Sequence, residues 1–116
     1  STWEALIFAC HRQLDNLTVL IDENGLQAFG STSEVASMAP LAARISGFDA
    51  DVREIDGHDP DALRDALNRP QKRLRIIILR TIKGARVAAL ENRLESHYLP
   101  LTTEQYVVAL DEVGRP

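Results

Sequence analysis

The sequence predicts an α/β fold, a three-layer arrangement in which a mostly parallel sheet has helices on both faces. Short apolar segments alternate with segments of helical spacing, in the order helix, strand, helix, strand, helix, strand, loop, helix. Strands that alternate with helices form parallel sheets. Ligands of such sheets bind outside the carboxyl ends of the strands. We therefore expect a site in the loops that follow the first and third strands, 22–26 and 81–84.

The first predicted helix covers residues 1–14, and a strand follows at 17–22. One face of the helix shows helical spacing. Its members are Trp3, Ile7, Cys10 and Leu14. The other faces are apolar too, and a helix that is apolar on most sides is normally buried on most sides. The strand is a nearly continuous apolar run, typical of strands covered on both faces. Both elements are therefore expected to pack against additional protein.

The next elements connect the first strand to the second. Residues 22–25 are expected to form a turn, because asparagine and glycine tolerate positive φ. A loop is predicted at 27–34. A helix is predicted at 37–45, with Pro40 in its first turn, where proline is tolerated. A weaker strand of mixed polarity at 51–55 suits a position near the edge of the sheet.

The second half of the chain contains the clearest signals. Asp59 and Pro60 favour the start of a helix. This helix is expected to bury Leu63, Ala66 and Leu67. The continuous apolar run within 74–79 predicts a buried strand. Residues 81–101 are expected to be a long irregular loop, and such loops are often functional. Thr102 and Gln105 have the spacing of a capping box at the start of a last helix. That helix carries Tyr106, Leu110 and Val113.

Composition excludes several classes of protein. Apolar residues make up 45% and charged residues 26% of the chain, as in ordinary globular proteins. The 17 acidic and 13 basic residues give a net charge of −4, which argues against nucleic-acid binding. No apolar run approaches the roughly 20 residues of a membrane span. The single cysteine predicts a reducing, cytoplasmic setting. No ligand spacing supports zinc hydrolysis, and no serine elbow supports a catalytic triad.

Asn24 and Leu26 could supply oxygens to a cation. One interpretation of 22–25 is an ordinary turn. In the other, the side-chain oxygen of Asn24 and the backbone carbonyl two residues on point at a hard cation such as Mg²⁺, which bridges phosphate oxygens. Such an ion still needs a carboxylate or further oxygens from elsewhere.

Lys83 and His97 are the remaining candidates. Lys83 follows the third predicted strand and could meet a phosphate as a point charge; the alternative is a solvated lysine. His97 lies in the long loop, where it could transfer a proton or contact an oxyanion; the alternative is a plain surface histidine. His11, His58 and Cys10 are interpreted as structural.

Several separate motifs resemble the transketolase family in order and spacing over nearly the whole chain. They are Trp3-Glu4-Ala5, Leu14-Asp15-Asn16-Leu17, Asp22-Glu23-Asn24-Gly25-Leu26-Gln27 with Gly30, Asp56-Gly57-His58-Asp59, Thr81-Ile82-Lys83-Gly84, Glu91-Asn92 and His97. The likeness is greatest to bacterial split transketolases that have an amino-terminal subunit. The resemblance implies the thiamine-diphosphate-binding fold, incomplete in this chain, with residues 1–116 as the carboxyl-side part of the diphosphate-binding domain.

The resemblance also implies an activity and a set of site residues. Transketolases move a two-carbon ketol unit from a ketol donor to an aldehyde acceptor with thiamine diphosphate and Mg²⁺. Asn24 and Leu26 would be metal ligands, and Asn24 would also lie beside the diphosphate. Lys83 and His97 would contact the cofactor, and His97, the catalytic candidate, would also touch the donor substrate.

The sequence departs from the family pattern in ways that imply partner chains. The Gly-Asp-Gly segment, whose aspartate is the third protein ligand of the metal, and the pyrimidine-binding side are both missing from these residues. One partner chain is expected to supply the segment, and another chain or domain the pyrimidine side; a fragment of a longer chain would have the same sequence. Arg86 stands at a usual glycine, and Ser96-His97-Tyr98 replaces Trp-His-Gly. The alternative hypothesis is a non-catalytic remnant acting as an interaction or regulatory module.

Overall fold

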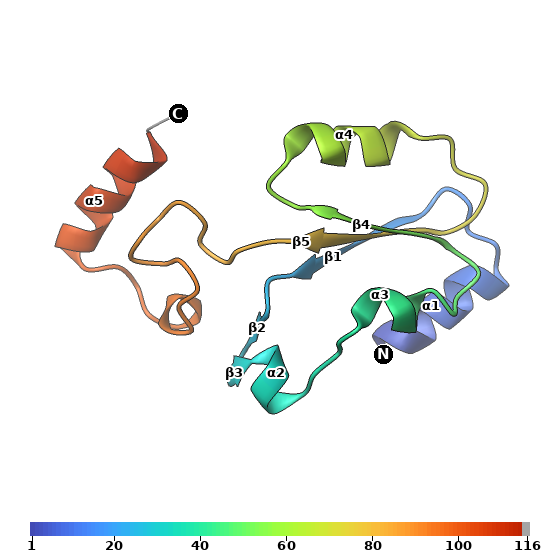
Figure 1. The fold of residues 1–116 in the computed structure, drawn as a ribbon, viewed down its shortest axis with the longest axis horizontal. Helices are drawn as coiled ribbons and strands as arrows, with labels where there is room; N and C mark the ends of the chain where they lie inside the picture. Colours follow the sequence, from blue (N-terminus) through green and yellow to red (C-terminus); the bar gives the residue numbers. More distant parts are fainter. Residues whose placement is uncertain (115–116) are drawn as a thin grey trace. The chain divides into compact units, whose positions relative to one another are not determined.

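The computed structural model describes residues 1–114, which form two compact units. The first unit comprises residues 1–23 and 38–80, and the second comprises 24–37 and the chain from Thr81 onward. Figure 1 shows the elements of both.

The first unit contains a three-stranded parallel sheet in the order β1-β5-β4. The strands are β1 (Thr18–Glu23), β5 (Arg75–Arg80) and β4 (Asp51–Asp56). All three predicted strands are therefore confirmed, with ends shifted by a residue. β5 is central, and its run from Ile76 to Ile78 is completely buried. β4 lies at one edge, as its mixed polarity predicted, and β1 lies at the other edge of the described sheet.

Helices cover both faces of this sheet, which confirms the predicted fold class. Helices α1 (Thr2–His11) and α3 (Leu41–Ile45) lie on one face, and α4 (Pro60–Asn68) lies on the other (Figure 1). The main core lies between the sheet and the first two helices. Its buried members are Leu6, Ala9, Leu41, Ile45, Ala50, Leu74, Ile76 and Ile78.

The face of α1 that packs on the sheet differs from the face that showed helical spacing in the sequence. Leu6 and Ala9 are buried, whereas Ile7, a member of the spaced face, is 58% exposed. Trp3 does face the core, where its ring stacks on Phe48 with centroids 5.5 Å apart. Because nearly every position of α1 is apolar, spacing alone could not tell which face packs on the sheet.

The helix predicted at 37–45 also needs correction. It begins at Leu41, and Pro40 is extended, with φ −79° and ψ 114°. A residue that precedes proline is disfavoured in the α region, so the helix could not extend backward through Ala39. In α4, Ala66 is buried as predicted, but Leu67 is 42% exposed. Neighbouring helical positions point about 100° apart, so both cannot face the sheet.

The second unit holds a small hairpin, the long loop and the last helix. The hairpin pairs β2 (Leu26–Gln27) with β3 (Gly30–Ser31), and α2 (Thr32–Val35) follows it. The prediction of a plain loop over 27–34 was thus wrong. Ser31 stabilises the short helix by accepting a hydrogen bond from the backbone N–H of Glu34 at 3.3 Å.

The remainder of the second unit follows the prediction. The stretch after Thr81 is irregular except for the 3₁₀ turn η1 (Glu95–His97). The last helix, α5 (Thr103–Val113), begins with the predicted capping box. Ala109 is its buried residue, while Tyr106, Leu110 and Val113 are exposed. Within residues 1–114, no helix has the length and apolar character needed to cross a membrane.

Candidate functional site

A cavity of about 110 Å³ lies within the second unit. Its lining residues are Asn24, Leu26, Gln27, Ala28, Lys83, Leu94 and His97. The structure therefore brings together all four residues that the sequence singled out, although they come from two segments far apart in the chain. Sequence reasoning assigned no role to the other three lining residues, Gln27, Ala28 and Leu94.

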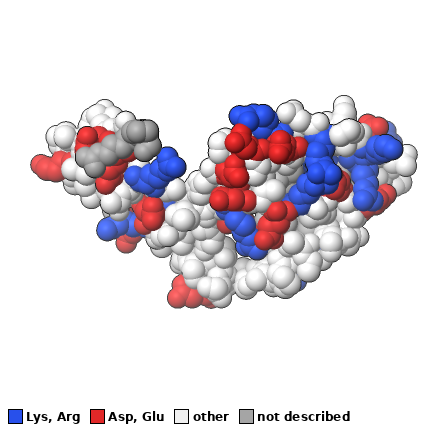
Figure 2. Space-filling model, turned by 45° about the horizontal axis from the view of Figure 1, so that its top comes forward, with Lys and Arg blue, Asp and Glu red and all other residues white. Residues whose placement is uncertain are grey.

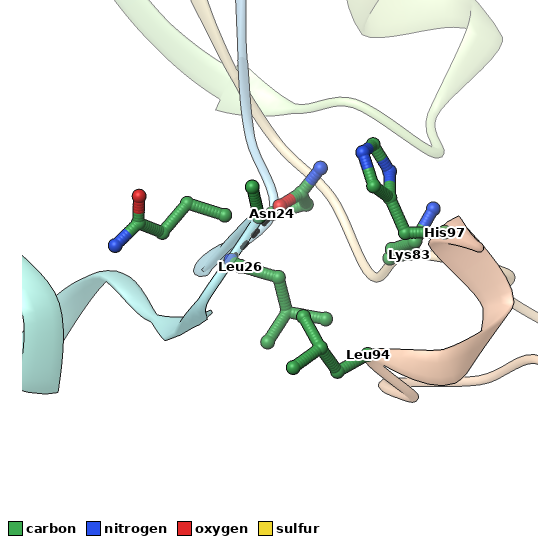
Figure 3. Close-up of a pocket in the computed structure, with 7 residues that line it drawn as sticks. Asn24, Leu26, Lys83, Leu94 and His97 are labelled. Carbon is green, nitrogen blue, oxygen red and sulfur yellow. Dashed lines mark hydrogen bonds between the residues drawn. The ribbon is translucent and has the colours of Figure 1, made fainter.

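Asn24 lies in a turn that begins later than predicted, because Asp22 and Glu23 belong to β1, and it also lines the cavity. Its side-chain oxygen accepts a hydrogen bond from the backbone N–H of Leu26 at 2.9 Å (Figure 3). Gly25 between them has φ +74°, which glycine adopts readily. A carbonyl oxygen has two lone pairs, so one hydrogen bond does not by itself exclude a second interaction at the same atom. The turn and the ligand interpretations of this segment are thus compatible.

Lys83 is held at the start of a tight loop. Its carbonyl accepts a hydrogen bond from the backbone N–H of Asn92 at 2.9 Å. Gly84 has φ +66°, and a Cβ atom at this position would lie 2.7 Å from both the Cβ and the carbonyl oxygen of Leu90. Only glycine fits this close approach without movement of the backbone.

The backbone of Arg86 adopts a conformation that glycine reaches more easily than other residues. It has φ +68°, in the left-handed region. Its backbone N–H donates to the carboxylate of Glu91 at 3.0 Å, which stabilises the turn despite the unfavourable φ. The exposed Arg86 side chain does not line the cavity.

His97 is exposed on η1 and has an aromatic neighbour. The ring of Tyr98 meets the imidazole edge-on, with centroids 4.8 Å apart and an interplanar angle of 88°. The Tyr98 hydroxyl donates a hydrogen bond to the carbonyl of Ala28 in the hairpin.

The cavity has an apolar side and a polar side. In Figure 3 the side chains of Leu26 and Leu94 point toward one another, while the Lys83 amine and the His97 ring project away from them. An ammonium group, an imidazole and an amide oxygen can together bind a phosphate group and contribute to a cation that accompanies it. The cavity is smaller than the roughly 300–1,000 Å³ of typical ligand sites, so it suits part of a cofactor.

The two oxygen donors that the sequence predicted for a metal are both neutral. They are the Asn24 side-chain oxygen and the Leu26 carbonyl. Over residues 1–114, no group of three or more histidine, cysteine, aspartate or glutamate residues is arranged to hold a metal ion. Mg²⁺ prefers carboxylate and phosphate oxygens. A metal–diphosphate group at these residues would therefore need further, acidic ligands.

Arg80 supports the strand ends from which both site segments begin. Its guanidinium forms an ion pair with Glu23 of β1 at 2.8 Å and another with Glu54 of β4 at 3.0 Å. Hydrogen bonding to Glu54, together with the charge of Glu23, raises the pKa of Arg80 above its ordinary value. β1 leads directly into Asn24, and β5 leads directly into Thr81. Sequence spacing could not reveal this group, because it depends on the strand order.

Charge elsewhere on the first unit is evenly mixed. Figure 2 shows Lys and Arg side chains interspersed with Asp and Glu side chains over the unit that holds α4, with no large patch of one sign on that face. This distribution agrees with the small net charge of −4.

Comparison with known proteins identifies the family. A family model described as the thiamine diphosphate binding domain of transketolase matches residues 1–114. The chain belongs to the transketolase family. The family assignment thereby confirms the resemblance based on the sequence motifs.

Relatives within the transketolase family include named subunits. The chain is 37% identical to a 6-deoxy-6-sulfo-D-fructose transketolase subunit of Clostridium sp. (strain MSTE9), with 97% of this chain and 42% of that protein covered. It is 32% identical to a subunit of the apulose-4-phosphate transketolase of Actinobacillus succinogenes, with the same coverage. The chain thus spans about two fifths of the length of these relatives.

A solved transketolase has the same fold. The structure of transketolase from Campylobacter jejuni matches with a TM-score of 0.80 and 26% identity, over 97% of this chain and 18% of that one. The transketolase fold of the described residues therefore includes the parallel sheet from which the two site segments extend.

Proposed function

We propose that this chain is a subunit or fragment of a thiamine-diphosphate-dependent transketolase-like transferase, in which it holds Mg²⁺ and the cofactor diphosphate for two-carbon ketol transfer. The observation that supports this proposal is that Asn24, Leu26, Lys83 and His97 line one cavity. Neither segment alone provides both oxygen donors and cationic groups. Membership of a diphosphate-binding family makes the cofactor the natural ligand of this combination.

Each residue has a distinct proposed role. The Asn24 side-chain oxygen and the Leu26 carbonyl are ligands of Mg²⁺, and the Lys83 ammonium neutralises phosphate charge. His97 contacts the cofactor and the donor substrate, where its imidazole can hold or transfer a proton near neutral pH. Thiamine diphosphate, when bound, supplies the nucleophilic thiazolium carbon.

The proposal includes substrates and partners. The two named relatives are transketolases of a sulfonated and of a phosphorylated sugar. We therefore expect a sugar-like ketol donor, for which an anionic end group is the first choice to test, and an aldehyde acceptor. We also propose a cytoplasmic enzyme in which a partner chain supplies the Gly-Asp-Gly segment with the acidic metal ligand, and another chain or domain supplies the pyrimidine side. The subunit names of the relatives support this division.

Replacement of Asn24 tests the proposed function. In the assembled complex, Asn24→Ala should abolish Mg²⁺-dependent binding of thiamine diphosphate, measured by calorimetry with and without Mg²⁺. Asn24→Asp keeps an oxygen for both the turn and the metal and should retain Mg²⁺ dependence. Asn16→Ala, at an exposed turn position outside the cavity, is the matched control and should bind normally. Unchanged affinity in Asn24→Ala would count decisively against the proposal.

The same measurement separates the alternative function. A non-catalytic interaction module is favoured by Arg86 and Tyr98, which replace usual glycines of the family pattern. Such a module predicts that the unmodified complex binds no thiamine diphosphate at any Mg²⁺ concentration, while assembly with the partner remains intact.

A further inference from the structure

Tyr98 connects two segments that line the cavity. Its hydroxyl donates a hydrogen bond to the carbonyl of Ala28, a residue 70 positions away in the sequence. Ala28 belongs to the turn between β2 and β3 and lines the cavity directly. Tyr98 itself immediately follows η1, which carries His97. The hydroxyl therefore ties the hairpin that presents Leu26 to the loop that presents His97.

The ring of Tyr98 constrains the His97 imidazole. The two rings meet in a T-shaped arrangement, with centroids 4.8 Å apart and planes at 88°. Aromatic pairs favour this edge-to-face geometry. His97 is exposed, so water alone would leave its ring several rotamers. The Tyr98 contact favours one of them.

We propose that Tyr98 is a positioning residue for this site. It acts through His97 and through the hairpin that holds the Leu26 carbonyl, and its own side chain does not line the cavity. This inference rests on the proposed function, in which those two groups hold the cofactor. A glycine at this position could provide neither the hydroxyl nor the ring, so the positioning is a feature of chains that carry tyrosine here.

Two substitutions separate the contributions of the hydroxyl and the ring. Tyr98→Phe removes only the hydrogen bond to Ala28, and Tyr98→Leu removes the ring as well. Tyr106→Phe is the matched control, because Tyr106 on α5 is 53% exposed and Tyr98 is 58% exposed. The readouts, taken in the assembled complex, are the NMR resonances of the His97 ring protons and the calorimetric Kd for thiamine diphosphate with Mg²⁺.

The expected pattern is graded. In Tyr98→Phe, the aromatic ring at position 98 should still shift the His97 proton resonances by most of the original amount. The Kd for thiamine diphosphate should rise about 2- to 10-fold, the effect of one neutral hydrogen bond. Tyr98→Leu should abolish the ring-current shift and raise the Kd further. Tyr106→Phe should change neither readout.

The outcomes distinguish this inference from the proposed function. Unchanged His97 resonances and an unchanged Kd in both Tyr98 variants overturn the positioning role. If the unmodified complex binds no thiamine diphosphate, the proposed function fails, and the resonances alone decide the role of Tyr98. In that case a shift in Tyr98→Leu supports the contact with His97, and a spectrum identical to that of the unmodified protein overturns it.

Discussion

Gly84 is the position where one methyl group should most disturb the loop that carries Lys83. A Cβ atom would lie 2.7 Å from the Leu90 carbonyl oxygen, and φ is +66°. Gly84→Ala therefore combines a left-handed conformation with a backbone clash, for an expected loss of at least about 2 kcal/mol of loop stability. Faster hydrogen exchange at the Asn92 amide, which donates to the Lys83 carbonyl, is the local measurement.

Gly25→Ala is the matched control for this substitution. Gly25 has a similar φ of +74°, but a Cβ atom there would have no neighbouring atom within 4 Å. Its replacement should cost only the backbone strain, about 1 kcal/mol. If the two alanine substitutions reduced stability equally, the contact with Leu90 would have no energetic effect.

At the scale of residues, sequence patterns singled out four residues that line the cavity but did not reveal how they are held. Asn24 and Lys83 follow apolar strands, so their place at one end of a parallel sheet could be inferred. The hydrogen bond from Tyr98 to Ala28 joins positions whose separation follows no helical or strand period, and no local rule could predict it. The roles assigned to Asn24, Leu26, Lys83 and His97 stay predictions until binding is measured.

Arg75 connects β5 to the carboxyl end of α4. The buried guanidinium donates to the carbonyl of Leu67 at 2.8 Å and to the carbonyl of Arg69. Arg75→Met should destabilise the protein by about 1–3 kcal/mol, because helix-end carbonyls lose charged donors in a buried place. Urea-induced unfolding followed by circular dichroism measures the change.

Arg64→Met, on α4, provides the comparison for Arg75→Met. Arg64 pairs with Asp61, and both side chains are well exposed. Exposed ion pairs contribute at most about 1 kcal/mol. A loss at Arg64 as large as that at Arg75 would mean that burial of the Arg75 guanidinium is irrelevant to its effect.

The first turn of α5 should be sensitive to acid. The backbone N–H of Glu104, and next the Thr102 hydroxyl, donate to the Glu104 carboxylate and lower its pKa from 4.5. Because the pKa of this carboxyl group is lower in the folded state than in the unfolded state, the carboxylate stabilises the fold at pH values above its unfolded-state pKa. This stabilisation disappears as the pH falls through the folded-state pKa. Amide exchange at the start of α5, corrected for intrinsic rates, should show less protection on acidification; Glu104→Gln should remove this dependence.

At the scale of elements, the sequence predicted types better than packing. The run from Ile76 to Ile78 allowed one interpretation, a buried strand, and β5 is central. In α1 apolar residues lie on every face, so spacing did not reveal that Ile7 is 58% exposed. The hairpin of β2 and β3 was missed because each strand has only two residues, too few to establish an alternating pattern.

At the scale of the whole molecule, the first unit has an exposed apolar surface of the kind that binds a partner chain. β1 is an edge strand of the described sheet, and Leu20 on it is 49% exposed. The outward face of α1 exposes Ile7 and Phe8 by 58% and 60%. A parallel strand at the open edge of a sheet, with apolar side chains exposed, favours pairing with additional protein. These are the two elements that the sequence predicted to need more covering.

Charged substitutions on this surface test the proposed assembly. In the chain co-expressed with the partner that carries the Gly-Asp-Gly segment, Ile7→Glu and Leu20→Glu should each weaken association at least about 10-fold, because a carboxylate loses its hydration on burial in an apolar interface. Analytical ultracentrifugation measures the dissociation constant. Since both side chains are exposed here, neither change should reduce the stability of the chain alone.

Leu67→Glu separates a specific interface from a general effect of charge. Leu67 is 42% exposed on α4, close to the exposed fraction of Leu20, but it lies on a helix whose pattern predicted no missing neighbour. Association should be unaffected by this change. If all three variants assemble like the unmodified chain, neither α1 nor β1 takes part in the interface. The acidic ligand proposed for the metal would then have to arrive by another surface, because β1 is the strand that leads directly into Asn24.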